Sequence, residues 1–412
     1  MLLVVAILGC LPTWVPVLSG QAAGYYRWDL WQMKPREGIL NEPVITEDDE
    51  KNEGFSACIL TMDDSMLWPE WLAYHYQTLP LRRLIVALDP KSKTKPTQVF
   101  ARYRKHGLPL NVTVWEDDEF LPHENLKRQI QPNTAGGNTL GKYLLRQEWF
   151  LHKCLEQLYA ENRTWVLLVD TDEFLAPQWQ NLIVLDEEES PTKVSTKPRN
   201  VFEMVTKYRN QTFSVNGNVK HSQWLDDISQ GCLYLDRKRF IPSPNETSML
   251  TSKDAVPYPL LTMEQDRWFH QYNGKVMLDL SKLSPAVAHS IFKNASIGEH
   301  TSPHMGLDVL CKPMRLANAQ SPFQGPFAAH HYANPLSWAL GRSHDPRYQD
   351  KLKSAMDDRK KATKFHNHTD LPFATAWVDG FVKRVTKEVA LELLLPVENL
   401  TAFSNHNTFV SN

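Results

Sequence analysis

The sequence predicts an α/β protein with a mostly parallel sheet flanked by helices, and three observations predict this class. Short apolar runs such as Leu84–Leu88 and Trp165–Val169 stop abruptly at acidic residues, as strands buried on both faces of a parallel sheet do. These runs alternate with stretches of helical periodicity, which implies right-handed crossovers between parallel strands. The 412 residues suffice for one large α/β domain or two smaller ones.

The expected elements follow one another in a regular rhythm. Those before residue 170 are strands at residues 55–61, Leu84–Leu88, Asn111–Trp115 and Trp165–Val169, and helices at Met66–Gln77, Thr97–His106 and Lys142–Ala160. Leu185–Asn200 carries charge runs and two prolines without periodicity, so we expect a solvated loop there. Phe373–Leu395 returns to a helical pattern, and we expect it to pack across the sheet as a closing helix.

The acidic run after Trp165–Val169 is the first candidate for chemistry. Ligands of open α/β sheets bind at the carboxyl ends of the strands, which is where Asp170 and Asp172 fall. Two carboxylates this close repel each other unless a cation lies between them. Oxygen ligands suit Mn²⁺ or Mg²⁺, so the pattern indicates a divalent metal site; the alternative is a strand end whose acids only make turns and caps.

Asp63 and Asp89 end the first two predicted strands and therefore face the same crevice. Either side chain is a candidate to accept hydrogen bonds from the base or ribose of a nucleotide, or it is a turn residue. Arg146, on the helix before the acidic strand end, is a candidate phosphate contact or a surface charge. The basic run Arg237–Arg239 is open to the same two interpretations.

The N-terminus indicates the secretory pathway. Residues 1–24 are apolar and uncharged, as in a cleaved signal peptide or a short single-pass signal anchor. N-glycosylation sequons support this compartment; they begin at Asn111, Asn162, Asn210, Asn245, Asn294, Asn367 and Asn399. A formal net charge of -2 gives no reason to expect a nucleic-acid partner. We expect residence in the Golgi lumen, as a type II membrane protein or a secreted one.

Cysteine spacing points away from a zinc cluster, because no C-x-x-C pair occurs. Cys10 lies in the leader, which leaves four cysteines and three pairings. Cys58 lies in an apolar strand and Cys154 on a helix face, and we expect both to be buried free thiols.

Three further groups of residues form recognisable motifs: Glu70-Trp-Leu-Ala-Tyr-His75, Asp170-Thr-Asp-Glu-Phe174, and His330-His331-Tyr332 with Arg342-Ser-His-Asp-Pro-Arg347. Together they resemble a family of glycosyltransferases with the GT-A (Rossmann-like) fold, the group allied to glycosyltransferase families 2 and 92. The resemblance covers residues 55–350, which it implies are the glycosyltransferase domain. Residues 25–54 are polar and mixed, as in a stem or lead-in, and we expect 351–412 to form a C-terminal helical extension. The resemblance also implies a UDP- or GDP-sugar donor and a glycan, glycoprotein or glycolipid acceptor.

The resemblance also assigns roles within the site. It implies Asp172 as a direct Mn²⁺ (or Mg²⁺) ligand, and Asp170 as a second ligand or a contact to ribose or metal-bound water. His331 is the expected ligand from a distant loop, ahead of His330, with His300 and His304 as rivals. Inversion needs a carboxylate base, for which Asp266 and Asp227 are chosen over Asp226 and Glu246.

The expected function is therefore metal-dependent, inverting transfer of a sugar from a nucleotide-sugar donor. A catalytically inactive glycan-binding module of the same fold is the alternative. A metal-dependent phosphoesterase is a third class, although such enzymes often use denser His/Asp clusters than this sequence contains.

Overall fold

The computed structural model describes residues 54–122, 139–177, 182–184, 213–215, 232–241, 267–285, 288, 327–332, 366–367 and 372–395. These residues are organised around one large sheet with the strand order β3-β2-β1-β4-β9-β8-β10-β5, and β11 (His366–Asn367) pairs with β9 beside this path. A separate two-stranded sheet joins β6 (Leu182–Val184) to β7 (Phe213–Val215). The expected leader and nearly all of the expected stem lie outside the described residues.

One half of the large sheet is parallel. It consists of β1 (Phe55–Thr61), β2 (Leu81–Leu88), β3 (Asn111–Trp115) and β4 (Trp165–Leu168). Every residue of β1, β2 and β4 is buried, which explains why these strands read as continuous apolar runs rather than alternating ones. Because all four strands run the same way, the residues that follow them gather at one edge of the sheet.

The other half of the sheet mixes directions. It contains β9 (Arg267–Asp279), β8 (Cys232–Ile241), β10 (Phe327–Tyr332) and β5 (Glu173–Pro177). β9 is antiparallel to both β4 and β8, β10 is parallel to β8, and β5 is antiparallel to β10. This half brings together residues that are distant in the sequence, such as Asp172 and His331, which are 159 positions apart.

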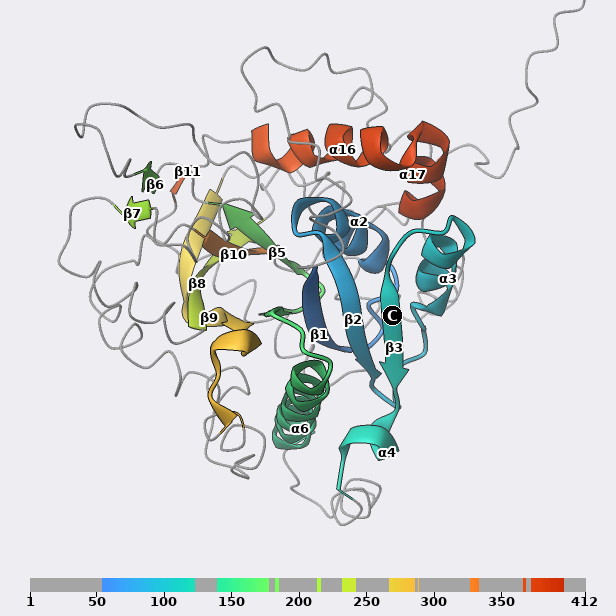
Figure 1. Ribbon diagram of the computed structural model, residues 1–412, viewed down its shortest axis with the longest axis vertical. Helices are drawn as coiled ribbons and strands as arrows, with labels where there is room; N and C mark the ends of the chain where they lie inside the picture. The colour runs from blue at the N-terminus through green and yellow to red at the C-terminus, as the bar shows by residue number, and fades with distance from the viewer. Residues whose placement is uncertain are drawn as a thin grey trace, which may run out of the picture.

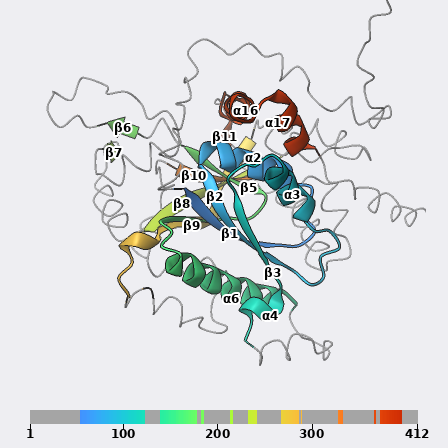
Figure 2. The same cartoon turned by 45° about the vertical axis from the view of Figure 1, so that its right-hand side comes forward.

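Helices cover both faces of the sheet, which confirms the α/β class. Figure 2 shows α6 (Thr139–Ala160) with α4 (Asp117–Phe120) on one face, and α2 (Trp68–Thr78) with α3 (Thr97–Lys105) on the other. Two C-terminal helices, α16 (Pro372–Val385) and α17 (Lys387–Leu394), lie outside α2 and α3 (Figure 1). Trp377 of α16 packs edge-on against Tyr74 of α2, with ring centroids 5.6 Å apart. The single closing helix expected from the sequence is thus a pair, and it packs on helices rather than directly on the sheet.

A disulfide between β1 and α6 corrects the expectation of two free thiols. Cys58 and Cys154 are bonded, with their Cα atoms 6.1 Å apart. The apolar surroundings predicted burial, and both residues are at most 1% exposed. They did not reveal that the inner face of α6 brings its cysteine directly over the one in β1. A bond closing a loop this long contributes on the order of 2–5 kcal/mol.

Asn111 and Asn162 are both exposed, at the start of β3 and shortly before β4, on the side of the sheet opposite the strand ends that carry Asp89 and Asp170. Glycans at these two positions would therefore lie away from the strand ends that carry the aspartates. None of the helices within the described ranges has the length and apolar character needed to cross a membrane.

Candidate functional site

The site is built on a tight reversal of the chain between β4 and β5. The Glu173 amide donates to the Asp170 carbonyl at 3.1 Å, and the Glu173 carboxylate accepts from the Asp170 amide at 2.9 Å. The turn therefore caps itself, and it holds Asp170 and Asp172 at the carboxyl end of β4. The Tyr332 amide, which donates to the Asp172 carbonyl at 3.0 Å, ties the turn to β10.

Strand register explains how His331 reaches this turn. His331 pairs with Glu173 in β5 and with Arg239 in β8, so the three residues form a row across the sheet. Directly paired residues project to the same face with Cβ atoms about 4.5–5.5 Å apart. The expectation that His331 lies in a covering loop is wrong, because its segment is a buried strand, β10, between β8 and β5.

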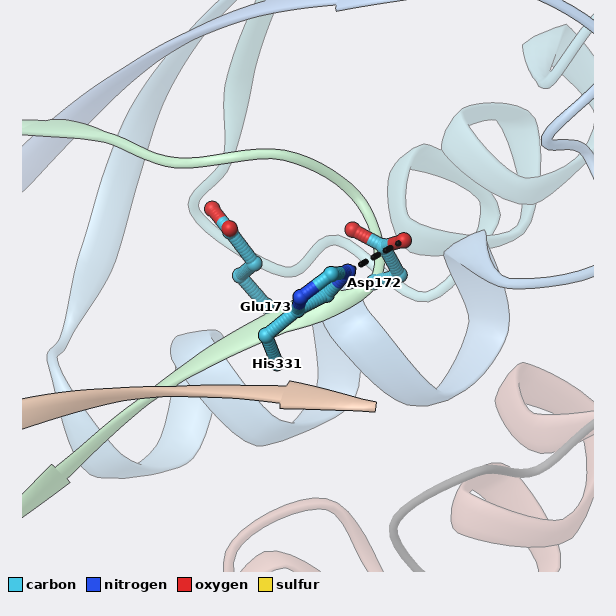
Figure 3. Close-up of side chains that lie close together, drawn as sticks. All are labelled: Asp172, Glu173 and His331. Atoms are coloured by element: carbon cyan, nitrogen blue, oxygen red, sulfur yellow. Dashed lines mark hydrogen bonds and ion pairs between the residues drawn. The ribbon is translucent and has the colours of Figure 1, made fainter. Parts of the chain in front are cut away.

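Asp172 and His331 meet at the end of this row. The His331 Nε2 atom lies 3.3 Å from the Asp172 Oδ2 atom, and Figure 3 shows the imidazole facing the carboxylate. Candidate ligand atoms of Asp172, Glu173 and His331 all lie within 4.8 Å of one another. Burial lowers the pKa of His331 well below its usual value, and the neighbouring Arg237 lowers it further. A neutral imidazole beside a carboxylate is a donor set that fits Mn²⁺.

Glu173 faces two cations, although its carboxyl group is close enough to count among the candidate ligands. Its Oε1 atom lies 2.5 Å from an Arg237 guanidinium nitrogen, and its Oε2 atom lies 3.0 Å from the Lys275 Nζ atom. Figure 3 shows the Glu173 carboxylate turned away from the pair of Asp172 and His331. Asp172 and His331 are therefore the two residues that fit a divalent cation best, and Glu173 anchors positive charge beside them.

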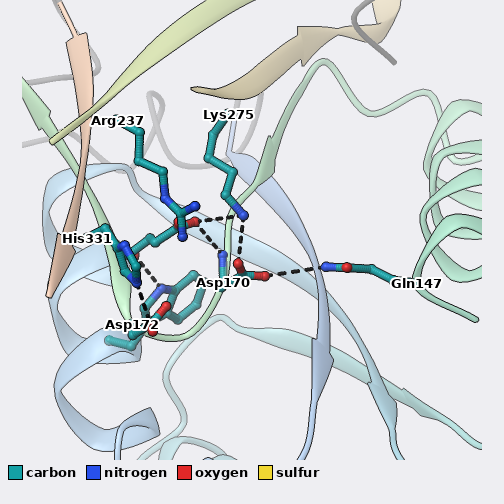
Figure 4. Close-up of polar contacts among 8 residues, drawn as sticks. Gln147, Asp170, Asp172, Arg237, Lys275 and His331 are labelled. Atoms are coloured by element: carbon teal, nitrogen blue, oxygen red, sulfur yellow. Dashed lines mark hydrogen bonds and ion pairs between the residues drawn. The ribbon is translucent and has the colours of Figure 1, made fainter. Parts of the chain in front are cut away.

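Asp170 lies on the other side of the turn. Its Oδ2 atom is 2.7 Å from Lys275 Nζ, and its Oδ1 atom accepts from the Gln147 amide of α6 at 3.4 Å (Figure 4). The Lys275 ammonium therefore lies beside the Asp170 carboxylate, where a divalent cation was expected from the sequence. Lys275 was not among the residues expected from the sequence; the signal for it is a lysine directly before the apolar run Val276–Leu278, and it is 2% exposed.

The position of Arg237 distinguishes between the two interpretations of the basic run 237–239, which are a phosphate contact and a solvated surface charge. β8 lies inside the sheet between β9 and β10, and the Arg237 side chain is 13% exposed. A solvated edge is therefore excluded for Arg237, whose charge is directed at Glu173.

Hydrogen bonds within the protein involve all three residues that were expected to contact nucleotide or phosphate, which are Asp63, Asp89 and Arg146. The Asp63 Oδ1 atom accepts from the amides of Lys93 and Thr94 at 2.5 and 3.0 Å. Arg146 donates to Asp89 Oδ2 at 2.7 Å and also to Asp117. The aspartates do line the expected edge of the sheet, and Arg146 crosslinks the ends of two neighbouring strands there.

The helix α2 fixes the strand that follows the turn, and this explains the first of the three resembling motifs. Trp71, Tyr74 and His75 are three and four residues apart, so they share one face of the helix. Trp71 Nε1 donates to the Glu173 carbonyl at 2.9 Å, and the Tyr74 hydroxyl donates to the Leu175 carbonyl at 2.6 Å. His75 Nε2 accepts from the Leu175 amide at 3.3 Å. We call these three side chains the α2 clamp.

His75 keeps a single tautomer in the clamp. Its Nδ1 atom donates to the Trp71 carbonyl at 2.8 Å, which leaves Nε2 as an acceptor. Burial lowers the pKa of His75 to about 3, so the ring is neutral. It also stacks on Phe174, with ring centroids 5.7 Å apart, which is consistent with Phe174 forming the floor of the site.

Adjacent histidines on a strand face opposite ways, and this separates His330 from His331. The His330 ring packs 4.7 Å from that of Phe240, in an aromatic group with Phe174 and Tyr332. The remaining candidates lie outside the described residues: Asp226, Asp227, Glu246, Asp266, His300, His304, Arg342 and Arg347.

Neither a family profile nor a curated protein sequence matches this chain. Among solved structures it is similar to an active-site mutant of LgtC, at 11% identity and a TM-score of 0.28, over 73% of this chain and 95% of that one. It is also similar to the galactosyltransferase LgtC in complex with donor and acceptor sugar analogs, at 12% identity and a TM-score of 0.26, over 84% and 99% of the two chains. A likeness this weak says nothing about the activity of this chain.

Proposed function

We propose that this chain is a metal-dependent, inverting glycosyltransferase with a GT-A-like fold that uses a nucleotide-sugar donor. One observation carries the proposal: a neutral imidazole meets a carboxylate at the end of a buried parallel strand, 3.3 Å apart. The two residues are 159 positions apart in the sequence. The D-x-D-E-F and H-H-Y segments that resemble GT-A glycosyltransferases, the group allied to families 2 and 92, are the segments that supply them.

Asp172 and His331 would hold Mn²⁺ in this proposal. The bound ion would neutralise the negative charge that builds on the diphosphate as it leaves the sugar. Asp172 contributes charge and His331 contributes a neutral nitrogen, while the turn hydrogen bonds and the α2 clamp keep both in place. Phe174 and the aromatic group behind it exclude water from the floor, which strengthens electrostatic interactions above it.

Asp63 and Asp89 would border the nucleoside. A carboxylate has about four lone-pair positions, so Asp89 can accept a further hydrogen bond while keeping its protein partners. Asp266 or Asp227 would take the proton of the acceptor hydroxyl as it attacks the anomeric carbon. The acceptor would be a glycan, glycoprotein or glycolipid.

We place the enzyme in the secretory pathway, in the Golgi lumen. The bond between Cys58 and Cys154 supports this compartment, because disulfides persist in oxidising environments and are rare in the cytosol. The exposed sequons at Asn111 and Asn162 also support it.

The test is a screen of UDP- and GDP-sugars for Mn²⁺-dependent release of the nucleoside diphosphate, with and without glycan acceptors. A glycosyltransferase hydrolyses one donor slowly and transfers its sugar faster once an acceptor is present. An inactive glycan-binding module binds glycans but releases no diphosphate from any donor. A phosphoesterase hydrolyses the diphosphate bridge of the donor into a nucleoside monophosphate and a sugar 1-phosphate, so no intact nucleoside diphosphate is released. Either of the last two results would reject the proposal.

A further inference from the structure

Lys275 is the most deeply buried cation at the candidate site. β9 runs antiparallel to β4, and Val276 pairs with Leu168, the last residue of β4. Lys275 therefore projects one position beyond the end of β4, where the turn begins. It is 2% exposed, and its Nζ atom lies 2.7 Å from Asp170 and 3.0 Å from Glu173.

Without any metal, the negative charges around the turn are already partly balanced by positively charged side chains. The carboxylates of Asp170 and Glu173 are paired with the ammonium of Lys275, and Glu173 is also paired with the guanidinium of Arg237. His331, the remaining ligand candidate, is neutral. Affinity for a hard divalent cation increases with the number of charged oxygen ligands. Of the two carboxylates of the D-x-D pair, Asp170 and Asp172, that of Asp170 is already paired with Lys275.

We propose that Lys275 is a resident cation of the D-x-D site that keeps Asp170 from acting as a metal ligand and makes metal binding depend on the nucleotide. The inference rests on the proposed function. Asp172 and His331 alone would hold Mn²⁺ weakly, since Lys275 repels a second cation and withholds a charged ligand. A nucleoside diphosphate brings oxygen ligands and negative charge, so the two bind together. By linkage, Mn²⁺ strengthens nucleotide binding by the same factor.

The test measures Mn²⁺ binding directly, by electron paramagnetic resonance of free Mn²⁺, with and without UDP or GDP. The wild-type protein is expected to bind Mn²⁺ at least about tenfold more tightly with the matching nucleotide than without it. Equal binding in both conditions would overturn the role of Lys275. A folded protein that binds no Mn²⁺ in either condition would instead reject the proposed metal site itself.

Variants assign the effect to the lysine. Lys275→Met removes the charge at similar volume, and it should raise nucleotide-free Mn²⁺ affinity by about tenfold and shrink the effect of the nucleotide. Lys275→Arg keeps the charge and should behave as wild type does. Lys153→Met is the control, because Lys153 is an exposed residue of α6 paired with Glu156, and it should change nothing. If folded Lys275→Met binds Mn²⁺ without nucleotide no more tightly than the wild type does, the proposal is contradicted. If that variant does not fold, the Mn²⁺ titrations of the wild type with and without nucleotide test the proposal.

Discussion

The α2 clamp can be tested through one hydroxyl group. Tyr74→Phe removes the donor to the Leu175 carbonyl, a 2.6 Å hydrogen bond between two residues that are both 0% exposed. Little volume is lost, so the cost is that of a buried carbonyl deprived of its donor, about 1–2 kcal/mol. This free energy corresponds to a roughly 5–30-fold fall in the ratio of folded to unfolded protein.

A second tyrosine supplies a matched control. The Tyr103 hydroxyl is also buried, but it has no hydrogen-bond partner among the residues that the structure describes, and burial raises the pKa of Tyr103 well above its usual value. Tyr103→Phe therefore removes an unsatisfied polar group, and it should leave stability unchanged or slightly increased.

The assay is equilibrium unfolding in urea, followed by near-ultraviolet circular dichroism, for the wild type and both variants. Tyr74→Phe should unfold at a lower urea concentration than the wild type. It should also bind Mn²⁺ with a nucleoside diphosphate more weakly, because β5 begins at Glu173, whose carboxylate caps the turn that bears Asp172. The reasoning is refuted if Tyr74→Phe is as stable as the wild type, or if Tyr103→Phe loses as much stability.

Four further predictions concern the metal site, the disulfide and the sequons. His331→Ala should weaken joint binding of Mn²⁺ and nucleotide by at least about tenfold, whereas His330→Ala should leave it within a few fold; equal losses would contradict the assignment. Because burial lowers the pKa of His331, its imidazole stays neutral as pH falls from about 8 to about 6.5, so this binding should be flat over that range in a titration and decline only in more acid solution. Cys154→Ser should lower the free energy of unfolding by on the order of 2–5 kcal/mol. An unchanged urea midpoint would show that the disulfide does not stabilise the fold. Protein from a secretory host should lose apparent mass when an N-glycan-removing enzyme is added; an unshifted band would count against the compartment.

Much of the parallel half of the sheet could be predicted from the sequence. Its strands are buried on both faces, so their apolar runs are continuous and their acidic ends mark one edge of the sheet. Asn111–Trp115 was predicted with its observed bounds, and the acidic end of β4 identified the turn that bears Asp172. The class of fold and one end of the site are therefore local properties of the chain.

The rest of the site depends on pairings between distant segments, which no local pattern reveals. His331 could be chosen from its motif, but its place in a buried strand beside β5 follows from register with Glu173 and Arg239. Lys275 carries no motif at all, and only the antiparallel pairing of β9 with β4 brings it to Asp170. The bond between Cys58 and Cys154 was missed for the same reason, because it depends on how α6 lies over β1.

The central claim is that Asp172, with His331, holds the cation that assists departure of a nucleoside diphosphate. The most direct measurement compares Mn²⁺-dependent release of nucleoside diphosphate by the wild type and by Asp172→Asn, using the donor that the screen identifies. The substitution removes a charge and little volume, so the circular dichroism spectrum and the urea midpoint should stay close to those of the wild type. We expect Asp172→Asn to lose turnover at every Mn²⁺ concentration while it remains folded. Near-normal turnover by the folded variant would contradict the central claim.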